Sequence, residues 1–374
     1  MKILYISKSI IPSRSANSIH VMKMCHAFAD NGHEVVLLAP DIKNRYEKDI
    51  KNIYDYYGVK KNFLIKKLWN PDYKFGTVIY ILNIFFFLLT NKKFDLIFGR
   101  FIHGCYIATL LKKKVIFETH EIIFKKKNFN YLIFKYLIKN KYLQKIIVIS
   151  NSLKNIYLKN KYLNKSMILV AHDGADKVKN FSSKTKLLGC VEKLKVGYVG
   201  HLYKGRGIQT IFKCAKEIND MTFHVVGGLK EDIKYWQSYL ENSGLKNIFF
   251  YGHVSPKKAF LYRNSFDIVL APYEKKVSIE GGGDTSKFMS PIKIFEYMSH
   301  KKAIIASDLP VIREVLNDSN SILVKCDDVK SWIKALHKLK DLKYRKFISN
   351  KALNDFYRFS WKNRASLIVK NFNN

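Results

Sequence analysis

The stretch that decides the fold is residues 284–316, DTSKFMSPIKIFEYMSHKKAIIASDLPVIREVL. Within it, Ser290 and Pro291 predict a helix start, with the serine as N-cap and the proline as the first helical residue. An apolar strand over residues 303–306 follows, and a second short helix should open at Pro310. A helix start beside a parallel strand is where α/β proteins hold phosphorylated ligands, so this pattern indicates such a site.

The residues before this stretch repeat a strand–helix alternation. Residues 2–7 and 34–40 are apolar strands, and residues 19–31 between them have helical spacing. A strand–helix–strand unit of this kind opens a doubly wound parallel sheet. Further apolar strands are expected over residues 94–98, 114–117, 145–150, 167–170, 223–226, 247–250 and 267–271. The chain is therefore predicted to be an α/β protein.

A second strand–turn–helix pattern starts at residues 195–199 and continues as a helix over residues 208–218. The turn between them, GHLYKGRG (200–207), contains three glycines that let the backbone approach a ligand. The helix N-terminus adds roughly half a positive charge, and Arg206 is placed in the turn to bind phosphate. No G-x-G-x-x-G fingerprint follows the first strand, which argues against a dehydrogenase.

Length and composition predict two ordinary α/β domains inside the cell. A chain of 374 residues with 48% hydrophobic and 14% aromatic residues has ample core for two domains. Met1 leads straight into an apolar strand, so no signal peptide is expected. The five cysteines are scattered without a C-x-x-C pair, which disfavours a disulfide framework or a zinc site.

The charge is strongly basic, +36 from 66 Lys+Arg and 30 Asp+Glu. Residues 122–172 contain no Asp or Glu, and their lysines alternate with Phe and Tyr. Such a segment suits an anionic membrane surface, where each lysine contributes on the order of 1 kcal/mol. Nucleic acid would use the same charge. The apolar run 78–89 is too short to span a bilayer, which leaves a buried helix or a helix at the membrane interface.

The motif SPIKIFEYM (290–298) and the segment AIIASDLPVIREVL (303–316) carry a family resemblance. They resemble the donor site of the group-1 (family four) retaining glycosyltransferases of the GT-B fold, and the rest of the chain is similar more weakly. The resemblance implies two Rossmann-like domains facing each other across a cleft, with a C-terminal helix crossing back to the first. The expected parts are an acceptor-binding domain (1–176), a linker (177–192), a nucleotide-sugar-binding domain (193–355) and the returning helix (356–374).

The resemblance also implies a donor site in the second domain. Glu296 stands where the family binds the ribose hydroxyls, and a surface salt bridge with Lys293 is the alternative interpretation. The glycine-rich turn would hold the diphosphate, with Arg206 and Lys293 as its cations, and the loop 252–254 would hold the base. The donor-binding candidates are Gly200, His201, Lys204, Gly205, Gly207, His253, Ser290, Pro291, Ile292 and Glu296.

His120 is the candidate in the first domain. It follows a predicted strand and lies between Glu118 and Glu121, where a histidine can bind a sugar hydroxyl or stabilise developing charge. The alternative is a polar loop residue. In the family a histidine at this place lies against the transferred sugar, so His120 joins Arg206 and Lys293 as a catalytic candidate.

The loop 8–18 follows the first strand and is rich in serine and asparagine. Many relatives have Gly-Gly in this loop, whereas this chain is similar to a subset with Ser-Ala-Asn-Ser-Ile-His (15–20). Since ligands bind at the carboxyl ends of parallel strands, Ser15, Asn17 and Ser18 are the acceptor-binding candidates.

Two positions depart from the family pattern: His201 replaces an arginine and Phe288 replaces the first glutamate of the motif. The lost contacts would come from Lys204, Lys293, Asp284, Glu280 or the amides after Met289. No Asp-x-Asp motif is present, so no metal and no cofactor besides the nucleotide-sugar co-substrate are expected. Retention at the anomeric carbon is implied by the resemblance alone. Trp361 is expected to be a packing anchor.

The leading hypothesis is a cytoplasmic glycosyltransferase, peripheral at the inner face of the membrane. It would move a sugar from a nucleotide-diphosphate sugar to a glycan or lipid-linked acceptor, in bacterial surface polysaccharide or glycoconjugate synthesis such as lipopolysaccharide or capsule. A basic nucleic-acid-binding protein is the alternative from another class, although no known binding motif accompanies the charge, so no nucleic acid is expected. A third hypothesis, suggested by Phe288 and His201, is a catalytically inactive GT-B scaffold.

Overall fold

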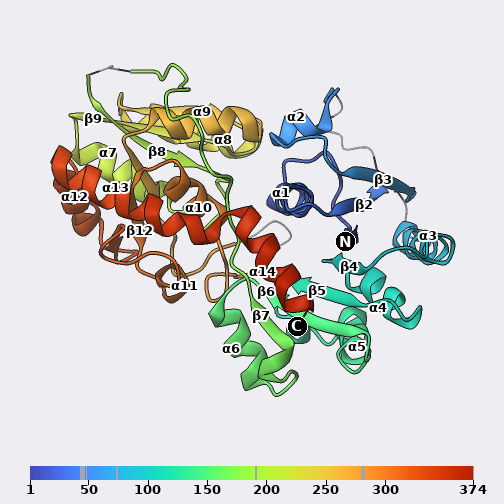
Figure 1. Ribbon diagram of the computed structural model, residues 1–374. Helices are drawn as coiled ribbons and strands as arrows, with labels where there is room; N and C mark the ends of the chain where they lie inside the picture. The colour runs from blue at the N-terminus through green and yellow to red at the C-terminus, as the bar shows by residue number, and fades with distance from the viewer. Residues whose placement is uncertain (43–46, 48, 73–74, 190–191, 279–282, 374) are drawn as a thin grey trace. The chain divides into compact units, whose positions relative to one another are not determined.

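The computed structural model describes residues 1–42, 47, 49–72, 75–189, 192–278 and 283–373. The chain divides into two compact units (Figure 1). The first unit comprises Met1–Asp173 and Trp361–Asn374, and the second comprises Gly174–Ser360. Each unit is built around one parallel β-sheet with helices between successive strands, so the predicted α/β class is confirmed.

The sheet of the first unit has the order β3-β2-β1-β4-β5-β6-β7 among the described residues, and every neighbouring pair is parallel. Its strands are β1 (Lys2–Ile6), β2 (Glu34–Asp41), β3 (Leu64–Trp69), β4 (Leu96–Gly99), β5 (Val115–Thr119), β6 (Leu143–Val148) and β7 (Ile168–Val170). The six apolar runs predicted here are all strands. The sequence pattern missed β3, because this edge strand is mostly solvent-facing and carries Lys66 and Lys67.

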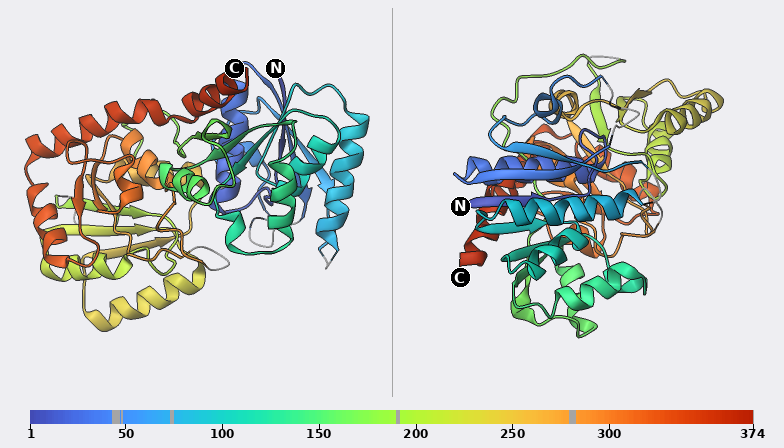
Figure 2. Two further views of the ribbon diagram at one scale, coloured as in Figure 1. Left: turned by 90° about the horizontal axis from the view of Figure 1, so that it is seen from below. Right: turned by 90° about the vertical axis from the view of Figure 1, so that its right-hand side faces the viewer.

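The helices of the first unit are α1 (Ala16–Asp30), α2 (Ile53–Tyr57), α3 (Gly76–Thr90), α4 (Ile102–Leu110), α5 (Phe129–Leu137), α6 (Asn151–Lys159) and α14 (Trp361–Asn373). Helix α1 begins three residues before the predicted start, because the Ser15 hydroxyl accepts the Ser18 N–H and caps the helix. The C-terminal helix α14 packs against α1 (Figure 2). Trp361 at its start is 3% exposed, which confirms the predicted packing anchor.

Helix α3 contains the apolar run predicted over residues 78–89. Tyr80, Ile84 and Leu88 lie at helical spacing and are buried. The exposed apolar residues of the opposite face are Phe75, Val78, Leu82, Phe86 and Leu89. The interpretation as a buried helix is therefore right for one face and wrong for the other. No helix in the described part of the chain is both long enough and apolar enough to cross a membrane.

The sheet of the second unit has the order β10-β9-β8-β11-β12-β13, again entirely parallel in the part described. The strands are β8 (Leu194–Val199), β9 (Met221–Val226), β10 (Ile248–Gly252), β11 (Ile268–Ala271), β12 (Ala303–Ser307) and β13 (Ile322–Val324). The helices are α7 (Ile208–Glu217), α8 (Lys230–Ser243), α9 (Pro256–Ser265), α10 (Ile292–Ser299), α11 (Pro310–Arg313), α12 (Val329–Lys338) and α13 (Leu342–Phe356). The strand order is that of a Rossmann sheet, with the order reversing between β8 and β11.

Strand β11 shows why this sheet reads as continuous apolar runs. Ile268 and Leu270 face one apolar cluster, and Val269 and Ala271 face another on the opposite side. Both faces are covered, so both alternating positions must be apolar. The segment predicted as a linker, residues 177–192, is tied to this unit at several points: Asn264 donates to Asn180 O and Ser183 O. Residues 190–191 of that segment lie outside the described residues.

Candidate functional site

The loops that follow β8, β9 and β10 meet at the carboxyl edge of the second sheet. The Gly200 N–H donates to Val226 O at 2.9 Å, and the Gly227 N–H donates to Gly252 O at 2.8 Å. Gly200 therefore lies beside the point where the strand order reverses, which is where ligands bind in sheets of this kind. The structure places the predicted turn 200–207 at this position.

Two glycines of the turn serve the chain's own packing. Gly205 and Gly207 have φ of +88° and +74°, values that favour glycine. A Cβ at Gly205 would collide with Lys276 O, and a Cβ at Gly207 would collide with Pro272 O. These residues therefore let the turn pack closely against the segment after β11. Gly200 differs, because a Cβ there would lie 2.8 Å from the Lys293 Nζ.

Lys293 and Arg206 form a pair of cations beside this turn. The Lys293 Nζ lies 3.7 Å from the centroid of the Tyr198 ring and 5.3 Å from that of Tyr273. The Arg206 guanidinium lies 5.5 Å from the same Tyr273 ring. Within the described residues no carboxylate forms an ion pair with either cation. Aromatic faces thus replace the anions that a pair of neighbouring cations would normally have.

The electrostatics of Lys293 are those of a strained cation. Burial lowers its pKa most, the nearby Arg206 charge lowers it further, and Glu296 raises it by less. The net pKa lies well below the ordinary value of 10.5. An anion bound between the two cations would reverse this shift, since it favours the charged ammonium. The arrangement is therefore suited to a phosphate or diphosphate group.

Glu296 is paired with a residue that the sequence did not indicate. Its Oε1 lies 3.2 Å from an Arg263 Nη2, and the side chain of Glu296 is 24% exposed. The alternative interpretation, a salt bridge between Glu296 and Lys293, is wrong, because α9 supplies Arg263 as the partner. The second carboxylate oxygen and the exposed edge of Glu296 leave it able to accept hydrogen bonds from a vicinal diol.

The remaining donor candidates surround this centre. His201 stacks on Tyr203 with ring centroids 4.8 Å apart, and Lys204 is exposed while its carbonyl accepts the Ser278 N–H. His253 directly follows β10. The last three candidates, Ser290, Pro291 and Ile292, precede Lys293 at the start of α10.

The predicted cap of α10 is wrong by one residue. The helix begins at Ile292 and its N-cap is Pro291, whose ψ of 113° is extended, so Ser290 lies before the cap. The proline ring fixes φ but leaves ψ free, and here the chain enters the helix one residue later than predicted.

The segment after β11 closes the site on the side of Tyr273. Tyr273 and Val277 are buried, and the Asp284 carboxylate accepts the N–H groups of Val277 and Ser286. Asp284 is thus occupied locally, which weakens its candidacy as a sugar ligand. The predicted mobility of this loop and the candidate Glu280 fall on residues 279–282, which lie outside the described residues.

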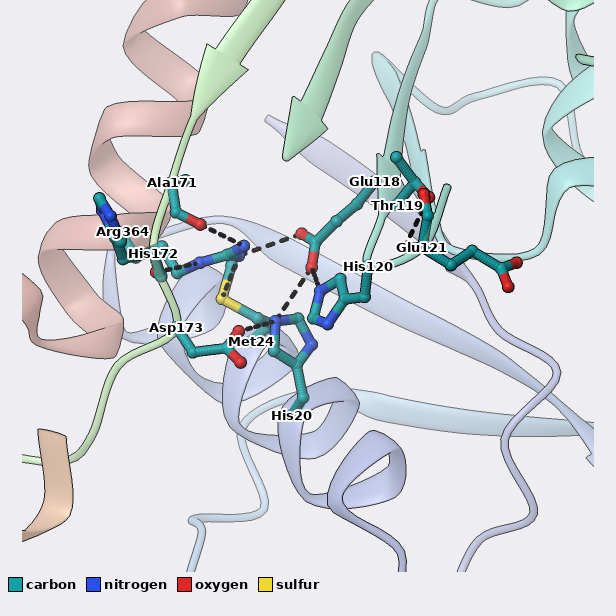
Figure 3. A network of polar contacts seen from close by, with 10 residues as sticks. All are labelled: His20, Met24, Glu118, Thr119, His120, Glu121, Ala171, His172, Asp173 and Arg364. Carbon is teal, nitrogen blue, oxygen red and sulfur yellow. Dashed lines mark hydrogen bonds and ion pairs between the residues drawn. The ribbon is translucent and has the colours of Figure 1, made fainter. Parts of the chain in front are cut away.

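A network of buried charges surrounds His120 in the first unit (Figure 3). Its centre is Glu118, whose carboxylate is inaccessible to solvent and accepts from the His120 Nε2 at 2.5 Å and from an Arg364 Nη1 at 3.1 Å. The His20 Nε2 lies 3.0 Å from Glu118 and 3.3 Å from Asp173. Arg364 also donates to the carbonyls of Ala171 and His172.

The carboxylates of this network are ionised. Burial alone would raise the pKa of Glu118, but the Arg364 and His20 charges and the histidine hydrogen bonds outweigh it and hold the pKa well below its usual range. Burial likewise raises and the neighbouring histidines lower the pKa of Asp173, with a net decrease. The anions are thus compensated within the chain.

His120 is neutral and has a defined tautomer. Burial and the Arg100 charge lower its pKa to about 4, against the opposing effects of Asp173 and Glu118. Since Glu118 is ionised, the His120 Nε2 carries the proton that the carboxylate accepts, and Nδ1 is left as an acceptor. The side chain is 19% exposed. His120 is therefore a fixed imidazole able to accept a hydrogen bond, for example from a hydroxyl, and it is not a simple loop residue.

The acceptor candidates lie in the first turn of α1. Ser15 is its N-cap, and the buried Ser18 hydroxyl donates to the carbonyls of Ser13 and Ser15. Asn17 is exposed. Two of the three candidates are thus engaged in local structure, which the sequence pattern S-x-x-S could have indicated as a cap. Their proposed contact with an acceptor stays a prediction.

One group of side chains in the described residues has donor atoms close enough to hold a metal ion. His20, His120 and Asp173 each offer one atom, and these atoms lie within 4.8 Å of one another. A metal there would compete with the hydrogen bond from His120 to Glu118 and would sit near the Arg364 charge. The group therefore fits a hydrogen-bonded network better than a divalent cation site.

Several residues of these two centres were not found from the sequence. Arg364 lies 246 positions from Glu118 along the chain, and Arg263 is a lone arginine on an ordinary helix. Tyr198 and Tyr273 follow apolar strand patterns and read as core. His20 was part of the quoted SANSIH motif, and its helical spacing to the Ser15 cap was the one available signal.

Comparisons with known proteins agree with this architecture. Residues 18–177 match the family described as Glycosyltransferase Family 4, and residues 193–341 match Glycosyl transferases group 1. An uncharacterized glycosyltransferase of Methanocaldococcus jannaschii, MJ1069, is 26% identical over 406 residues, which covers 100% of this chain and 95% of the relative.

Solved structures share the fold at low identity. Sucrose-phosphate synthase from Thermosynechococcus elongatus has a TM-score of 0.73 at 14% identity, covering 100% of this chain and 98% of that one. Anabaena Alr3699/HepE in complex with UDP has a TM-score of 0.72 at 14% identity, with 100% of both chains covered. The apo form of the lipopolysaccharide outer core galactosyltransferase WaaB has a TM-score of 0.66 at 16% identity, with 100% and 98% covered.

Proposed function

Because this chain belongs to the group-1, family-4 glycosyltransferases of the GT-B fold, we propose that it transfers a sugar from a nucleotide-diphosphate sugar to a glycan or lipid-linked acceptor. The observation that carries this proposal is the pair Arg206 and Lys293, two neighbouring cations held by tyrosine rings beside the switch point of the sheet. A departing nucleoside diphosphate supplies the negative charge that this pair lacks. Solved structures of the similar Anabaena HepE contain UDP, UDP with glucose, or UDP-glucose, which supports a nucleotide-sugar donor.

The residues divide the work in this proposal. Arg206 and Lys293 neutralise the diphosphate, Gly200 leaves room beside Lys293, and Glu296 accepts from the ribose hydroxyls. His120, with a neutral imidazole fixed by Glu118, accepts a hydrogen bond from the transferred sugar. Charge neutralisation by side chains makes a metal unnecessary for leaving-group departure. Retention at the anomeric carbon rests on the family resemblance.

The acceptor and location are finer parts of the proposal. We expect synthesis of a bacterial surface polysaccharide or glycoconjugate, such as lipopolysaccharide or capsule, at the cytoplasmic face of the membrane. The basic segment 122–172 supports the location, since Lys125, Lys126 and Lys127 are exposed beside α5. Fewer aromatic residues face outward than predicted: Phe124, Tyr131, Phe134, Tyr157 and Tyr162 pack on one another. Phe129 and Tyr136 stay exposed.

The test is a panel of nucleoside diphosphates and nucleotide sugars, read by thermal stabilisation and then by release of the nucleoside diphosphate on turnover. One base should stabilise the wild type, and Arg206→Ala and Glu296→Ala should lose most of that effect, while Lys257→Ala on the surface of α9 serves as control. Wild-type binding by both site variants contradicts the site. Binding without turnover for every donor and acceptor supports the inactive scaffold, and salt-sensitive binding of nucleic acid without nucleotide binding supports the alternative class.

A further inference from the structure

Helix α3 has an apolar face that no part of the described chain covers. Phe75, Val78, Leu82, Phe86 and Leu89 follow one another at steps of three or four residues and are all exposed; we call these five residues the α3 stripe. The helix spans Gly76–Thr90 and contains no charged residue. A surface helix normally shows polar side chains on the face away from the core. An exposed apolar stripe of this length therefore indicates a surface that binds something.

The apolar surface continues onto the neighbouring edge strand. Strand β3 packs beside α3, and the Asn83 amide donates to Trp69 O at 2.8 Å. Trp69 is 63% exposed, whereas Trp236, Trp332 and Trp361 are buried. Tryptophan is a residue that prefers the boundary between water and hydrocarbon.

Lysines gather at the end of the same helix. The Lys113 Nζ donates to Lys92 O at 2.7 Å, which joins the C-terminal ends of α3 and α4. The lysines of these two ends are Lys92, Lys93, Lys112, Lys113 and Lys114. Residues 73–94 and 96–117 contain no Asp or Glu. Asp95 is the one acid between these ranges, and it accepts the Lys2 N–H at 2.6 Å.

We propose that α3 is a membrane-interface helix, with the α3 stripe inserted at the boundary of headgroups and acyl chains of an anionic bilayer. The lysines at the ends of α3 and α4 then lie at the level of the lipid phosphates, where long side chains keep their charge in water. An apolar face with cationic flanks is the combination that such a surface binds. The inference extends the proposed membrane location, which rests on the segment 122–172, by naming a separate element that inserts.

A second copy of this chain fits the same surface less well. A twofold interface through the α3 stripe would bring the lysines of both copies together. With a net charge of +36, the chain offers few carboxylates to compensate that repulsion. A bilayer containing anionic lipid supplies both the apolar phase and the opposite charge.

The experiment uses the full chain and vesicles of phosphatidylcholine alone or mixed with an equal share of phosphatidylglycerol. Flotation measures the partition coefficient, and Trp69 emission, with quenching by brominated acyl chains, measures insertion of this surface. The test variant is Leu82→Ser/Phe86→Ser. The matched control is Leu342→Ser/Phe347→Ser on α13, which removes one leucine and one phenylalanine of similar exposure from the second unit. Circular dichroism and nucleotide-induced stabilisation check that each variant is folded.

We expect the wild type to float with anionic vesicles and its Trp69 emission to shift to the blue and to be quenched. Leu82→Ser/Phe86→Ser should lower the partition coefficient about tenfold or more and abolish the quenching, while the α13 control matches the wild type. Wild-type partition and quenching by the α3 variant overturn the inference and leave binding to the lysines alone. Self-association that the α3 variant abolishes, without vesicle binding by the wild type, also overturns it. Nucleotide-sugar turnover with no vesicle binding removes the membrane location and the inference together and leaves the transferase function intact.

Discussion

The two units hold buried or partly buried charges in opposite ways. Around Glu118 the first unit places two carboxylates among Arg364, His20 and His120, so each charge has a partner from the chain itself. Beside Gly200 the second unit places Arg206 and Lys293 together with tyrosine rings and no ion-pair partner among the described residues. The difference separates a charge network that maintains structure from one that awaits a ligand.

The physical reason is the cost of burying charge. A buried ion that is paired and hydrogen-bonded is tolerated, and removing its partner is costly. Two like charges held close together destabilise the empty state, and an anion that binds them recovers that energy. The comparison therefore predicts opposite effects on stability when one charge is removed from each cluster.

Glu118→Ala should have the largest effect. It leaves Arg364 buried without its carboxylate and His120 without its acceptor, so we expect the first unit to lose about 3–5 kcal/mol of stability. Urea unfolding with hydrogen exchange in β5 and α14 measures this loss. Glu34→Ala, on a carboxylate with 60% side-chain exposure, is the control and should change little. A Glu118→Ala protein as stable as the control would mean that the network is not holding the unit together.

Lys293→Met should have the opposite sign on stability. Removing the unpaired cation leaves the second unit as stable as the wild type or more stable, while affinity for the nucleotide sugar falls by about 2–3 kcal/mol, or roughly 30- to 150-fold. Calorimetry of binding and thermal unfolding of the same sample measure both quantities. Loss of stability together with loss of binding would show that Lys293 is a structural residue.

Acid should weaken the first unit. The pKa of His120 is about 4 in the folded chain against 6.5 when unperturbed, so between these values the unfolded chain binds more protons. Stability is therefore complete above pH 6.5 and falls as the pH decreases toward 4, by on the order of 2 kcal/mol. The lowered pKa values of Glu118 and Asp173 add loss at still lower pH. His120→Gln should flatten the pH dependence above pH 5, and an unchanged slope would contradict the assignment.

Glu296→Gln should reduce affinity by about 1–1.5 kcal/mol, close to tenfold, because a neutral acceptor binds a diol less strongly. The sharper measurement compares a ribonucleotide with its 2′-deoxy analogue. The wild type should prefer the ribonucleotide, and the variant should lose most of that preference. Equal preference in both proteins would assign Glu296 to its pair with Arg263 alone.

Chelation should have the smallest effect. Since Arg206 and Lys293 supply the positive charge, EDTA should leave nucleotide-sugar affinity and turnover unchanged, as should added magnesium. Metal analysis of the purified protein accompanies the assay. Activity that EDTA abolishes and zinc restores, but that His20→Gln protein does not regain, would instead assign a metal to His20, His120 and Asp173.

Much of the fold could be predicted because the chemistry is local. Parallel sheets buried on both faces require apolar runs such as residues 2–7 and 267–271, and these runs are visible in the sequence. The glycine-rich turn and Pro310 at the first position of α11 are local signals as well. Strand β3 was missed because an edge strand need not be apolar.

The charge networks could not be predicted because they depend on the tertiary structure. Arg364 reaches Glu118 from the last helix, and Arg263 reaches Glu296 from α9, and neither pair has a sequence spacing that marks it. Helix α3 shows the same limit in another form. Every position of its apolar run reads as core, and the packing alone decides that Leu82 and Phe86 are exposed while Ile84 is not.

The most direct test of the contrast between the two clusters is proton uptake on binding. Calorimetry with the best-binding nucleotide sugar, whose diphosphate does not titrate near neutral pH, is run in buffers of different ionisation enthalpy. Burial and Arg206 lower the pKa of Lys293 in the empty site, and the bound diphosphate raises it again. Binding should therefore take up a proton between these two pKa values, and affinity should fall as the pH rises through that window. Lys293→Met should bind weakly without proton uptake. Tight binding by the wild type with no proton uptake and no pH dependence, matched by the variant, would contradict an unpaired cation at the donor site.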